Sequence, residues 1–177
     1  IEEIKKQEGV CAVMLEFIQG EGGVIPQNKQ FIAQVYDYCK KSDILFIADE
    51  VQTGVGRTGK FLCSEHYGVR PDITTLAKGL GGGLPVGAML VGEKCENVMG
   101  AGTHGSTFGG NPVVCAGGKY VLSRIDEKLL EEVAAKGEYI KSRLEGVKGV
   151  KSVSGLGLML GIELDGKKAA DVVKECI

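Results

Sequence analysis

The amino-acid sequence predicts an α/β protein whose sheet is mostly parallel and is flanked by helices. Two apolar runs, over 10–15 and 44–48, lack the polar alternation of a half-exposed strand. Such continuous runs are typical of strands buried on both faces of a parallel sheet. Between them, apolar residues recur at helical spacing, and strands that alternate with helices form mostly parallel sheets.

The other elements follow from the same periodicities and from the glycine-rich stretches between them. In chain order, the sequence predicts a strand over 10–15, a helix over 26–41, a strand over 44–48, a short helix over 61–67, strands over 73–77 and 86–91, one or two helices over 111–146, and strands over 150–153 and 158–164. The connection before the strand 86–91 is short, which favours an antiparallel pair with the strand before it.

Composition places the chain among ordinary globular proteins, with 44% hydrophobic and 25% charged residues. A net charge of -2 gives no reason to expect nucleic acid or an anionic membrane as a partner. The apolar runs are shorter than the roughly 20 residues of a spanning helix, and no signal peptide is expected. The six cysteines form no CxxC pair, so we expect no disulfide framework, no metal site and a reducing cytoplasm as the location.

Both ends of the chain have the pattern of interrupted helices. The sequence begins with Ile1 in a helical charge pattern, and it stops at Ile177 in another helix-like run. We therefore expect the chain to be a piece of a longer protein.

Three chemically active side chains come at the ends of predicted strands: Glu16, Asp49 and Lys78. In parallel sheets, ligands bind outside the carboxyl ends of the strands, so these side chains predict one shared site. Four glycines follow Lys78 within five residues, which lets the backbone approach a bound molecule. An amine held there is a candidate for a Schiff base to a carbonyl cofactor, and the alternative is a lysine that reaches into solvent.

An aspartate that ends a buried strand needs a partner, and a protonated pyridine nitrogen is a suitable one. Lys78 would then supply the amine and move protons. Val51 is expected on the same face of an extended segment as Asp49, where it could press on a flat ring, and Gln52 could donate to a ring oxygen. The alternative for Asp49 is a structural carboxylate that backbone donors satisfy.

Ser106 and Thr107 lie in a glycine-rich turn just before a predicted helix. Their hydroxyls and the free backbone N–H groups of such a turn suit a phosphate. Plain N-capping of the helix is the alternative for both residues.

Four stretches of the chain, over 16–23, 45–59, 71–85 and 104–112, carry a family resemblance in the right order. In them the chain resembles the class III aminotransferases, which depend on pyridoxal 5'-phosphate (PLP). The resemblance implies a fold type I PLP-dependent transferase, truncated at both ends. It implies residues 1–122 as the later part of the large cofactor-binding domain, and 123–177 as a linking helix and the start of the small C-terminal α+β domain.

The resemblance also implies roles for individual residues. Lys78 would be the catalytic, cofactor-binding lysine and Asp49 the partner of the pyridine nitrogen. Val51 would pack on the ring, and Gln52 would contact the ring hydroxyl. In a homodimer, Thr107, with Ser106 beside it, would bind the cofactor phosphate of the neighbouring subunit.

Two carboxylates would contact substrate by the same resemblance. Glu21 resembles the glutamate that pairs with a substrate-binding arginine or releases it, and Glu16 resembles its supporting carboxylate. The form of residues 104–110 favours the branch that transfers the ω-amine of N-acetylornithine to 2-oxoglutarate in arginine biosynthesis. Enzymes acting on ornithine or 4-aminobutyrate, the aminomutase of glutamate semialdehyde, and a catalytically incomplete fragment are the alternatives.

The chain departs from the family pattern in two respects. Phe17 stands where proline is usual, and we expect this to loosen the loop that carries Glu21. The family's chain also extends beyond both ends, and none of Arg57, Arg70, Arg124 and Arg143 matches its arginine for the substrate α-carboxylate.

Two nucleotide-binding patterns are nearly present. Residues 54–61 approach a phosphate-binding loop, but Phe61 stands where Ser or Thr must reach the metal. A dinucleotide fingerprint beginning at Gly79 fails because Leu84 stands at its third glycine. Both patterns are therefore weaker interpretations than the aminotransferase.

Overall fold

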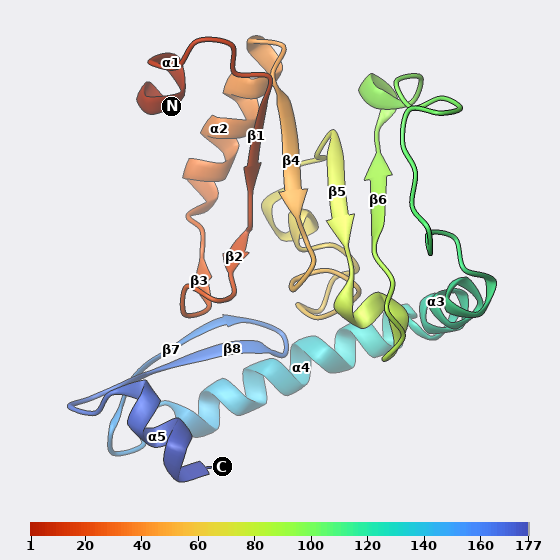
Figure 1. The fold of residues 1–177 in the computed structure, drawn as a ribbon. Helices are drawn as coiled ribbons and strands as arrows, with labels where there is room; N and C mark the ends of the chain where they lie inside the picture. Colours follow the sequence, from red (N-terminus) through yellow and green to blue (C-terminus); the bar gives the residue numbers. More distant parts are fainter. Residues whose placement is uncertain (177) are drawn as a thin grey trace.

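The computed structural model describes residues 1–176, and Ile177 lies outside the described residues. Its main sheet has the strand order β1-β4-β5-β6 (Figure 1). The strands are β1 (Ala12–Leu15), β4 (Leu45–Asp49), β5 (Ile73–Leu76) and β6 (Ala88–Val91). Strands β1, β4 and β5 are parallel, whereas β6 runs antiparallel to β5. The predicted mostly parallel sheet and its antiparallel last strand are thus confirmed.

The helices agree with the predicted order. They are α1 (Glu2–Lys5), α2 (Lys29–Lys41), α3 (Pro112–Arg124), α4 (Glu127–Leu144) and α5 (Ala169–Cys176), with 3₁₀ turns η1 (Cys63–Tyr67), η2 (Lys78–Gly81) and η3 (Glu93–Cys95). Helix α2 begins later than predicted because Asn28 caps it, accepting hydrogen bonds from the backbone N–H groups of Gln30 and Phe31. Pro26 instead pairs with Ile18 in the short ladder of β2 (Ile18–Gln19) and β3 (Ile25–Pro26).

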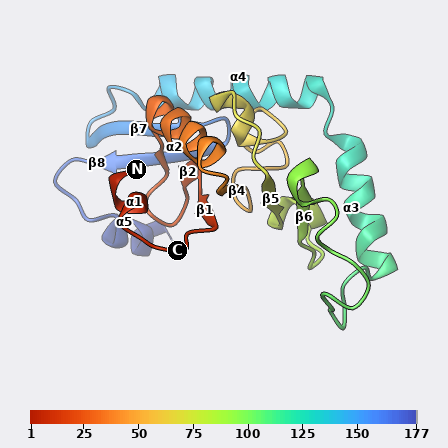
Figure 2. The same cartoon turned by 90° about the horizontal axis from the view of Figure 1, so that it is seen from above.

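The hydrophobic core lies between the sheet and α2, which covers one face (Figure 2). Phe17 is 0% exposed, and its ring centroid lies 4.9 Å from that of Tyr67. The Tyr67 hydroxyl donates to the Phe17 carbonyl at 2.9 Å. The aromatic contact and this hydrogen bond hold Phe17 itself, whereas the looser loop at Glu21 stays a prediction.

The second face of the sheet is half-exposed. The strand register aligns Met14, Ile47, Ile73 and Val91 in one row across it. Met14 is 54% exposed and Val91 40%. The prediction that the strands 10–15 and 44–48 are buried on both faces is thus wrong within residues 1–176, where the α2 face of these strands is the better covered one.

A further two-stranded sheet, separate from the β2–β3 ladder, packs against the loops below the main sheet. Strands β7 (Val150–Leu156) and β8 (Met159–Leu164) form an antiparallel hairpin, and α4 runs beneath both parts of the chain (Figure 1). The Ser154 hydroxyl donates to the Val24 carbonyl at 2.8 Å, and the Leu158 N–H donates to the Arg57 carbonyl at 3.0 Å. The division of the chain after residue 122 stays a prediction.

Several classes of site find no support within the described residues. All six cysteines are free, and Cys39, Cys63 and Cys95 are buried. No cluster of three or more His, Cys, Asp or Glu side chains occurs there that could hold a metal ion. None of the helices in this part of the chain has the length and apolar character needed to cross a membrane.

A substitution in the turn of the β7–β8 hairpin tests how this hairpin is held against the loop after β4. Gly157 has a φ of 53°, and a Cβ there would lie 2.5 Å from the carbonyl carbon of Thr58. We expect Gly157→Ala to lower the free energy of unfolding by about 3 kcal/mol, because it adds a left-handed backbone penalty to overpacking. Urea denaturation measures the loss.

Gly166→Ala is the matched control for this measurement. Gly166 also has a positive φ, 71°, but nothing lies within 4 Å of its Cβ position. Its substitution should cost only the backbone penalty, about 1 kcal/mol. Equal losses in free energy of unfolding in the two variants would show that the close packing at Gly157 contributes nothing to stability.

Candidate active site

The structure confirms that the three predicted strand ends lie along one edge of the sheet. Strands β1, β4 and β5 are parallel, and Glu16, Asp49 and Lys78 lie at or just after their carboxyl ends. These ends point toward α4 and the β7–β8 hairpin (Figure 1). One edge of the sheet therefore carries two carboxylates and an amine, although their roles stay predictions.

The Asp49 carboxylate is held by two donors. Its Oδ1 accepts hydrogen bonds from the Val51 N–H at 3.0 Å and from the Thr75 hydroxyl at 3.2 Å. The chain thus turns back directly after β4, and the predicted extended segment from Asp49 to Val51 is wrong. Within residues 1–176 no hydrogen bond to Oδ2 is formed, so this oxygen can accept one from a ligand.

Thr75 is a site residue that sequence reasoning missed. It pairs with Asp49 in the register of β4 and β5, and both lie on the half-exposed face of the sheet. The available signal was the pair of threonines, Thr74 and Thr75, in the strand before Lys78. The pairing of Thr75 with Asp49 can be inferred only when the register of β4 and β5 is known.

A hydrogen bond joins Gln52, in the loop after β4, to Glu21, in the loop between β2 and β3. The Gln52 side-chain amide donates to Glu21 Oε1 at 3.2 Å. Gly20 allows this approach, because a Cβ at Gly20 would lie 2.5 Å from Gln52 Cδ. Glu16 closes the same loop by accepting the Gly20 N–H at 3.1 Å. Glu16, Glu21 and Gln52 therefore form one connected set.

Lys78 has an unusual backbone. Its φ of 45° lies in the left-handed region, which costs a residue with a side chain roughly 1–2 kcal/mol. The residue begins the η2 turn, immediately after β5, and its side chain is exposed. Strain of this kind gathers at functional sites, where surrounding structure holds it in place.

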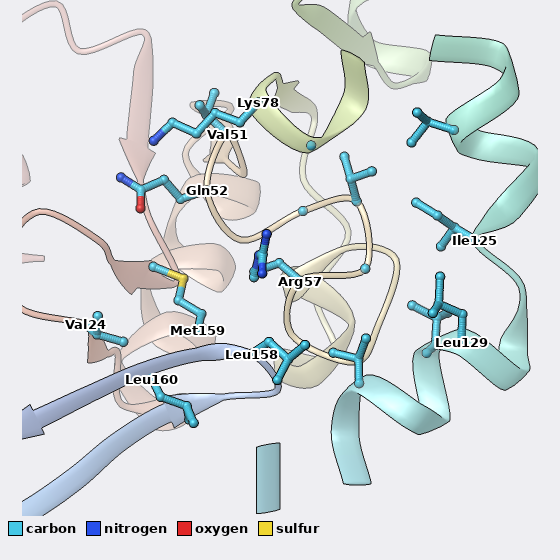
Figure 3. Close-up of a pocket in the computed structure, with 17 residues that line it drawn as sticks. Val24, Val51, Gln52, Arg57, Lys78, Ile125, Leu129, Leu158, Met159 and Leu160 are labelled. Atoms are coloured by element: carbon cyan, nitrogen blue, oxygen red, sulfur yellow. The ribbon is translucent and has the colours of Figure 1, made fainter. Parts of the chain in front are cut away.

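A cavity of about 570 Å³ contains the Lys78 side chain. Val51, Gln52 and Arg57 from the loop after β4 line it, together with apolar side chains of α3, α4 and the β7–β8 hairpin (Figure 3). The volume suits a small-molecule ligand. The three carboxylates Asp49, Glu16 and Glu21 do not line this cavity, although lining residues are close to them in the sequence.

Ser106 and Thr107 are not brought to this cavity. Both are exposed, in the segment that connects β6 to α3 on the far side of β6 from β1 (Figure 1). The Ser106 hydroxyl accepts the Gly109 N–H at 2.9 Å. Asn111 caps α3 through the N–H groups of Val113 and Val114, so the capping alternative for Ser106 and Thr107 is wrong.

Glu50 is the second functional residue that sequence reasoning missed. Its side chain is fully buried and accepts hydrogen bonds from the backbone N–H groups of Cys63 and Ser64 and from the Thr53 hydroxyl. Burial raises the pKa of the Glu50 carboxyl, although these donors oppose the increase. The acidic pair at the end of β4 was the visible signal, but the partners of its second member lie 13 and 14 residues away.

The loop between β4 and η1 does not have the form of a phosphate-binding loop. Residues 51–62 fold as a series of turns that end in the 3₁₀ turn η1, and no α-helix begins there. A phosphate-binding loop needs the N-terminus of an α-helix. The nucleotide interpretation of residues 54–61 is therefore wrong.

Comparison with known proteins identifies the family. The model of the class-III aminotransferases matches residues 1–176. The chain therefore belongs to the class-III aminotransferase family. It is 47% identical to the acetylornithine aminotransferase of Haemophilus ducreyi over 97% of this chain, and 53% identical to that of Corynebacterium efficiens over 92%. It spans 44% and 40% of the lengths of these relatives.

Solved structures agree with the fold. The acetylornithine aminotransferase from Elizabethkingia anophelis matches with a TM-score of 0.88 at 40% identity, over 98% of this chain and 45% of that protein. An ornithine aminotransferase from Toxoplasma gondii, described with partial PLP occupancy at its active site, matches with a TM-score of 0.85 at 37% identity. That match covers 93% of this chain and 40% of the other.

The buried Glu50 gives the protein a defined pH response. Its folded-state pKa is raised above the usual 4.5, so the folded protein keeps the proton to higher pH than the unfolded chain. The contribution of Glu50 to stability therefore falls as pH rises above 4.5. Relative to Glu50→Gln, which cannot titrate, we expect the wild type to lose stability between pH 4 and pH 7.

Urea denaturation of both proteins across this pH range measures the difference in free energy of unfolding. A difference in free energy of unfolding that stays constant, or that shifts in favour of the wild type as pH rises, would contradict a raised pKa for Glu50.

Proposed function

We propose that this protein is a PLP-dependent aminotransferase and that its reacting amine is Lys78. The observation that carries the proposal is the strained backbone that holds Lys78 in a ligand-sized cavity with Val51 and Gln52, at the sheet edge where Asp49 ends β4. The residues fit the cofactor: they offer an amine, an amide donor, an apolar contact and a carboxylate oxygen without a protein partner. When bound, PLP supplies an aldehyde that condenses with amines and a ring that accepts electrons.

Each residue of this set has a distinct task in the proposal. The Lys78 Nζ would hold the cofactor and would move protons to and from substrate carbon. Asp49 Oδ2 would accept a hydrogen bond from the protonated ring nitrogen, while Val51 and Thr75 fix the carboxylate through Oδ1. Val51 would pack on the ring, and Gln52 would donate to the ring hydroxyl.

Ser106 and Thr107 bind the cofactor phosphate of a neighbouring subunit in the proposed homodimer. Their exposure and their distance from the chain's own cavity support this assignment, since hydroxyls that are exposed in one subunit are free to reach another. Within residues 1–176, the lining of the chain's own cavity contains no hydroxyl side chain, so in this proposal the hydroxyl contacts to the phosphate come from another subunit.

Glu16 and Glu21 act on the substrate side. Gln52, which lines the cavity, donates a hydrogen bond to Glu21, and the hydrogen bond from the Gly20 N–H to Glu16 closes the loop that carries Glu21. In the proposal, Glu21 pairs with a substrate-binding cation or releases it when the second substrate enters. Glu16 supports this exchange by holding the loop.

The amino donor we propose is N-acetylornithine, which two similar enzymes carry in their names. Its ω-amine passes to 2-oxoglutarate, giving N-acetylglutamate semialdehyde and glutamate. This reaction belongs to arginine biosynthesis, and the cytoplasm is the proposed location. The chain spans 44% of the Haemophilus ducreyi relative, so the narrower form of the proposal is lysine chemistry without complete turnover.

Ornithine is the second candidate donor. The similarity to the Toxoplasma gondii ornithine aminotransferase, at 37% identity, favours it. Turnover measured with each amine and 2-oxoglutarate discriminates between the two donors.

Covalent trapping tests the role of Lys78. We expect the protein to become yellow with PLP, and borohydride reduction to fix one pyridoxyl phosphate on Lys78. Lys78→Ala should lose this adduct completely, because no other lysine lines the cavity in residues 1–176. Intact mass and peptide mapping measure the result.

Lys60→Ala is the matched control, since Lys60 is an exposed lysine outside the cavity, on the loop after β4 that contributes Val51, Gln52 and Arg57 to the lining. It should keep the adduct at Lys78. An adduct spread over surface lysines in the wild type would reject Lys78 as the reacting amine.

Asp49→Asn tests the ring contact separately. Asparagine can still accept the hydrogen bonds of Val51 and Thr75, but it carries no charge to stabilise a protonated ring nitrogen. We expect the adduct on Lys78 to persist while kcat falls about 10²–10³-fold, as for other removed electrostatic contacts. A kcat equal to that of the wild type would contradict the assigned role.

A further inference from the structure

The loop between β2 and β3 contains a residue with a strained backbone. Val24 has a φ of 55°, which lies in the left-handed region. A β-branched residue is a genuine outlier there, because its side chain crowds the neighbouring backbone. Such a conformation persists only where the surrounding structure holds it. The contacts that hold Val24 therefore also set the shape of the loop that carries Glu21.

The β7–β8 hairpin provides these contacts. The Ser154 hydroxyl donates to the Val24 carbonyl at 2.8 Å. Gly161, the cross-strand partner of Ser154, lies against the same part of the loop. A Cβ at Gly161 would lie 2.9 Å from the Val24 Cβ and 2.9 Å from the Gly23 carbonyl oxygen. The hairpin thus offers the loop one hydroxyl and, beside it, a position without a side chain.

Turn hydrogen bonds connect Val24 to Glu21. The N–H groups of Gly23 and Val24 donate to the Gly20 carbonyl at 3.1 Å and 3.2 Å. Glu21 lies inside the turn that these bonds close, and its carboxylate accepts the side-chain amide of Gln52 at 3.2 Å. Gln52 lines the cavity that holds the candidate amine. A change of backbone conformation at Val24 would therefore move the Glu21 carboxylate relative to this cavity.

Open space borders Val24 on two sides. Val24 lines the cavity of Lys78 together with Met159 and Leu160 of the hairpin (Figure 3). It also lines a second cavity, of about 520 Å³, whose wall includes Ser154. Because two cavities adjoin the residue, side-chain packing holds Val24 incompletely. The hydrogen bond from Ser154 then has a correspondingly larger share in fixing its backbone.

We propose that Ser154 is a positioning residue of the candidate active site. Its hydroxyl holds Val24 in the left-handed conformation, and the loop in this shape presents Glu21 to Gln52. The inference rests on the proposed function for the role of Glu21 on the substrate side, and it adds the residue that sets where this carboxylate lies. Because Ser154 belongs to the hairpin, a movement of the hairpin relative to the main sheet is passed on to Glu21.

The side-chain amide of Gln52 reports the position of Glu21, so its resonance in a two-dimensional proton–nitrogen NMR spectrum tests the proposal. In Ser154→Ala this resonance should move toward the position that it has in Glu21→Ala, where the acceptor is absent. Ser154→Thr keeps a hydroxyl and should leave the resonance near its wild-type position. A Gln52 resonance that coincides in Ser154→Ala and the wild type would overturn the proposal.

Ser152→Ala is the matched control. Ser152 lies two residues earlier on β7, and its hydroxyl donates to Glu163 at 2.9 Å instead of to the loop. Its substitution should leave the Gln52 resonance unchanged. A shift of the same size in Ser152→Ala would mean that any disturbance of the hairpin moves Glu21, and it would reject a specific role for Ser154.

A second measurement asks whether Ser154 acts through the strain at Val24. Glycine adopts the left-handed region freely, so Val24→Gly removes the strain. Ser154→Ala should accelerate hydrogen exchange of the N–H of residue 24 about tenfold when Val24 is present, and clearly less in the Val24→Gly background. Equal acceleration in both backgrounds would contradict the proposal. If Ser154→Ala fails to fold, the double variant should fold, and failure of both would reject a positioning role.

Trapping of PLP on Lys78 is an independent measurement, and it separates this inference from the proposed function. An adduct on Lys78 together with an unchanged Gln52 resonance in Ser154→Ala rejects the positioning role and leaves the aminotransferase. A shifted Gln52 resonance without an adduct on Lys78 leaves the positioning of Glu21 by Ser154 and rejects the aminotransferase.

Discussion

The hydrogen bonds of one buried carboxylate determine the shape of the candidate site. Glu50 begins the segment that leaves β4, and it accepts the N–H groups of Cys63 and Ser64 at the segment's other end. Residues 51–62 are thereby closed into a compact loop, although they contain little regular secondary structure. Val51, Gln52 and Arg57 all belong to this loop, so their positions in the cavity wall depend on a residue that does not itself line the cavity.

The sequence was sufficient to predict the edge of the sheet on which the site lies. Buried parallel strands end at recognisable residues, so Glu16, Asp49 and Lys78 could be assigned to one edge before their distances were known. The order of helices and strands followed from periodicity for the same reason. Helix α2 differs from its predicted start at Pro26 because the Asn28 side chain caps it two residues later.

The contacts within the site could not be predicted in this way, because they join residues distant in the sequence. Thr75 reaches Asp49 through a parallel register, and Glu50 reaches Ser64 through a loop closure. Arg57 matched no known role, and its place in the cavity is determined by its hydrogen bond to Leu158, about a hundred residues later in the chain. Phe17, which departs from the family pattern, is likewise buried against a residue distant in the sequence, Tyr67.

The left-handed backbone of Lys78 has a consequence for protein engineering. At this φ, glycine is the residue that backbone energetics favours, and lysine is held there against that preference. Optimisation of the sequence for folding stability alone would therefore tend to replace Lys78 by glycine and remove the amine. Any stabilised version of this chain has to keep position 78 fixed and seek its gains elsewhere.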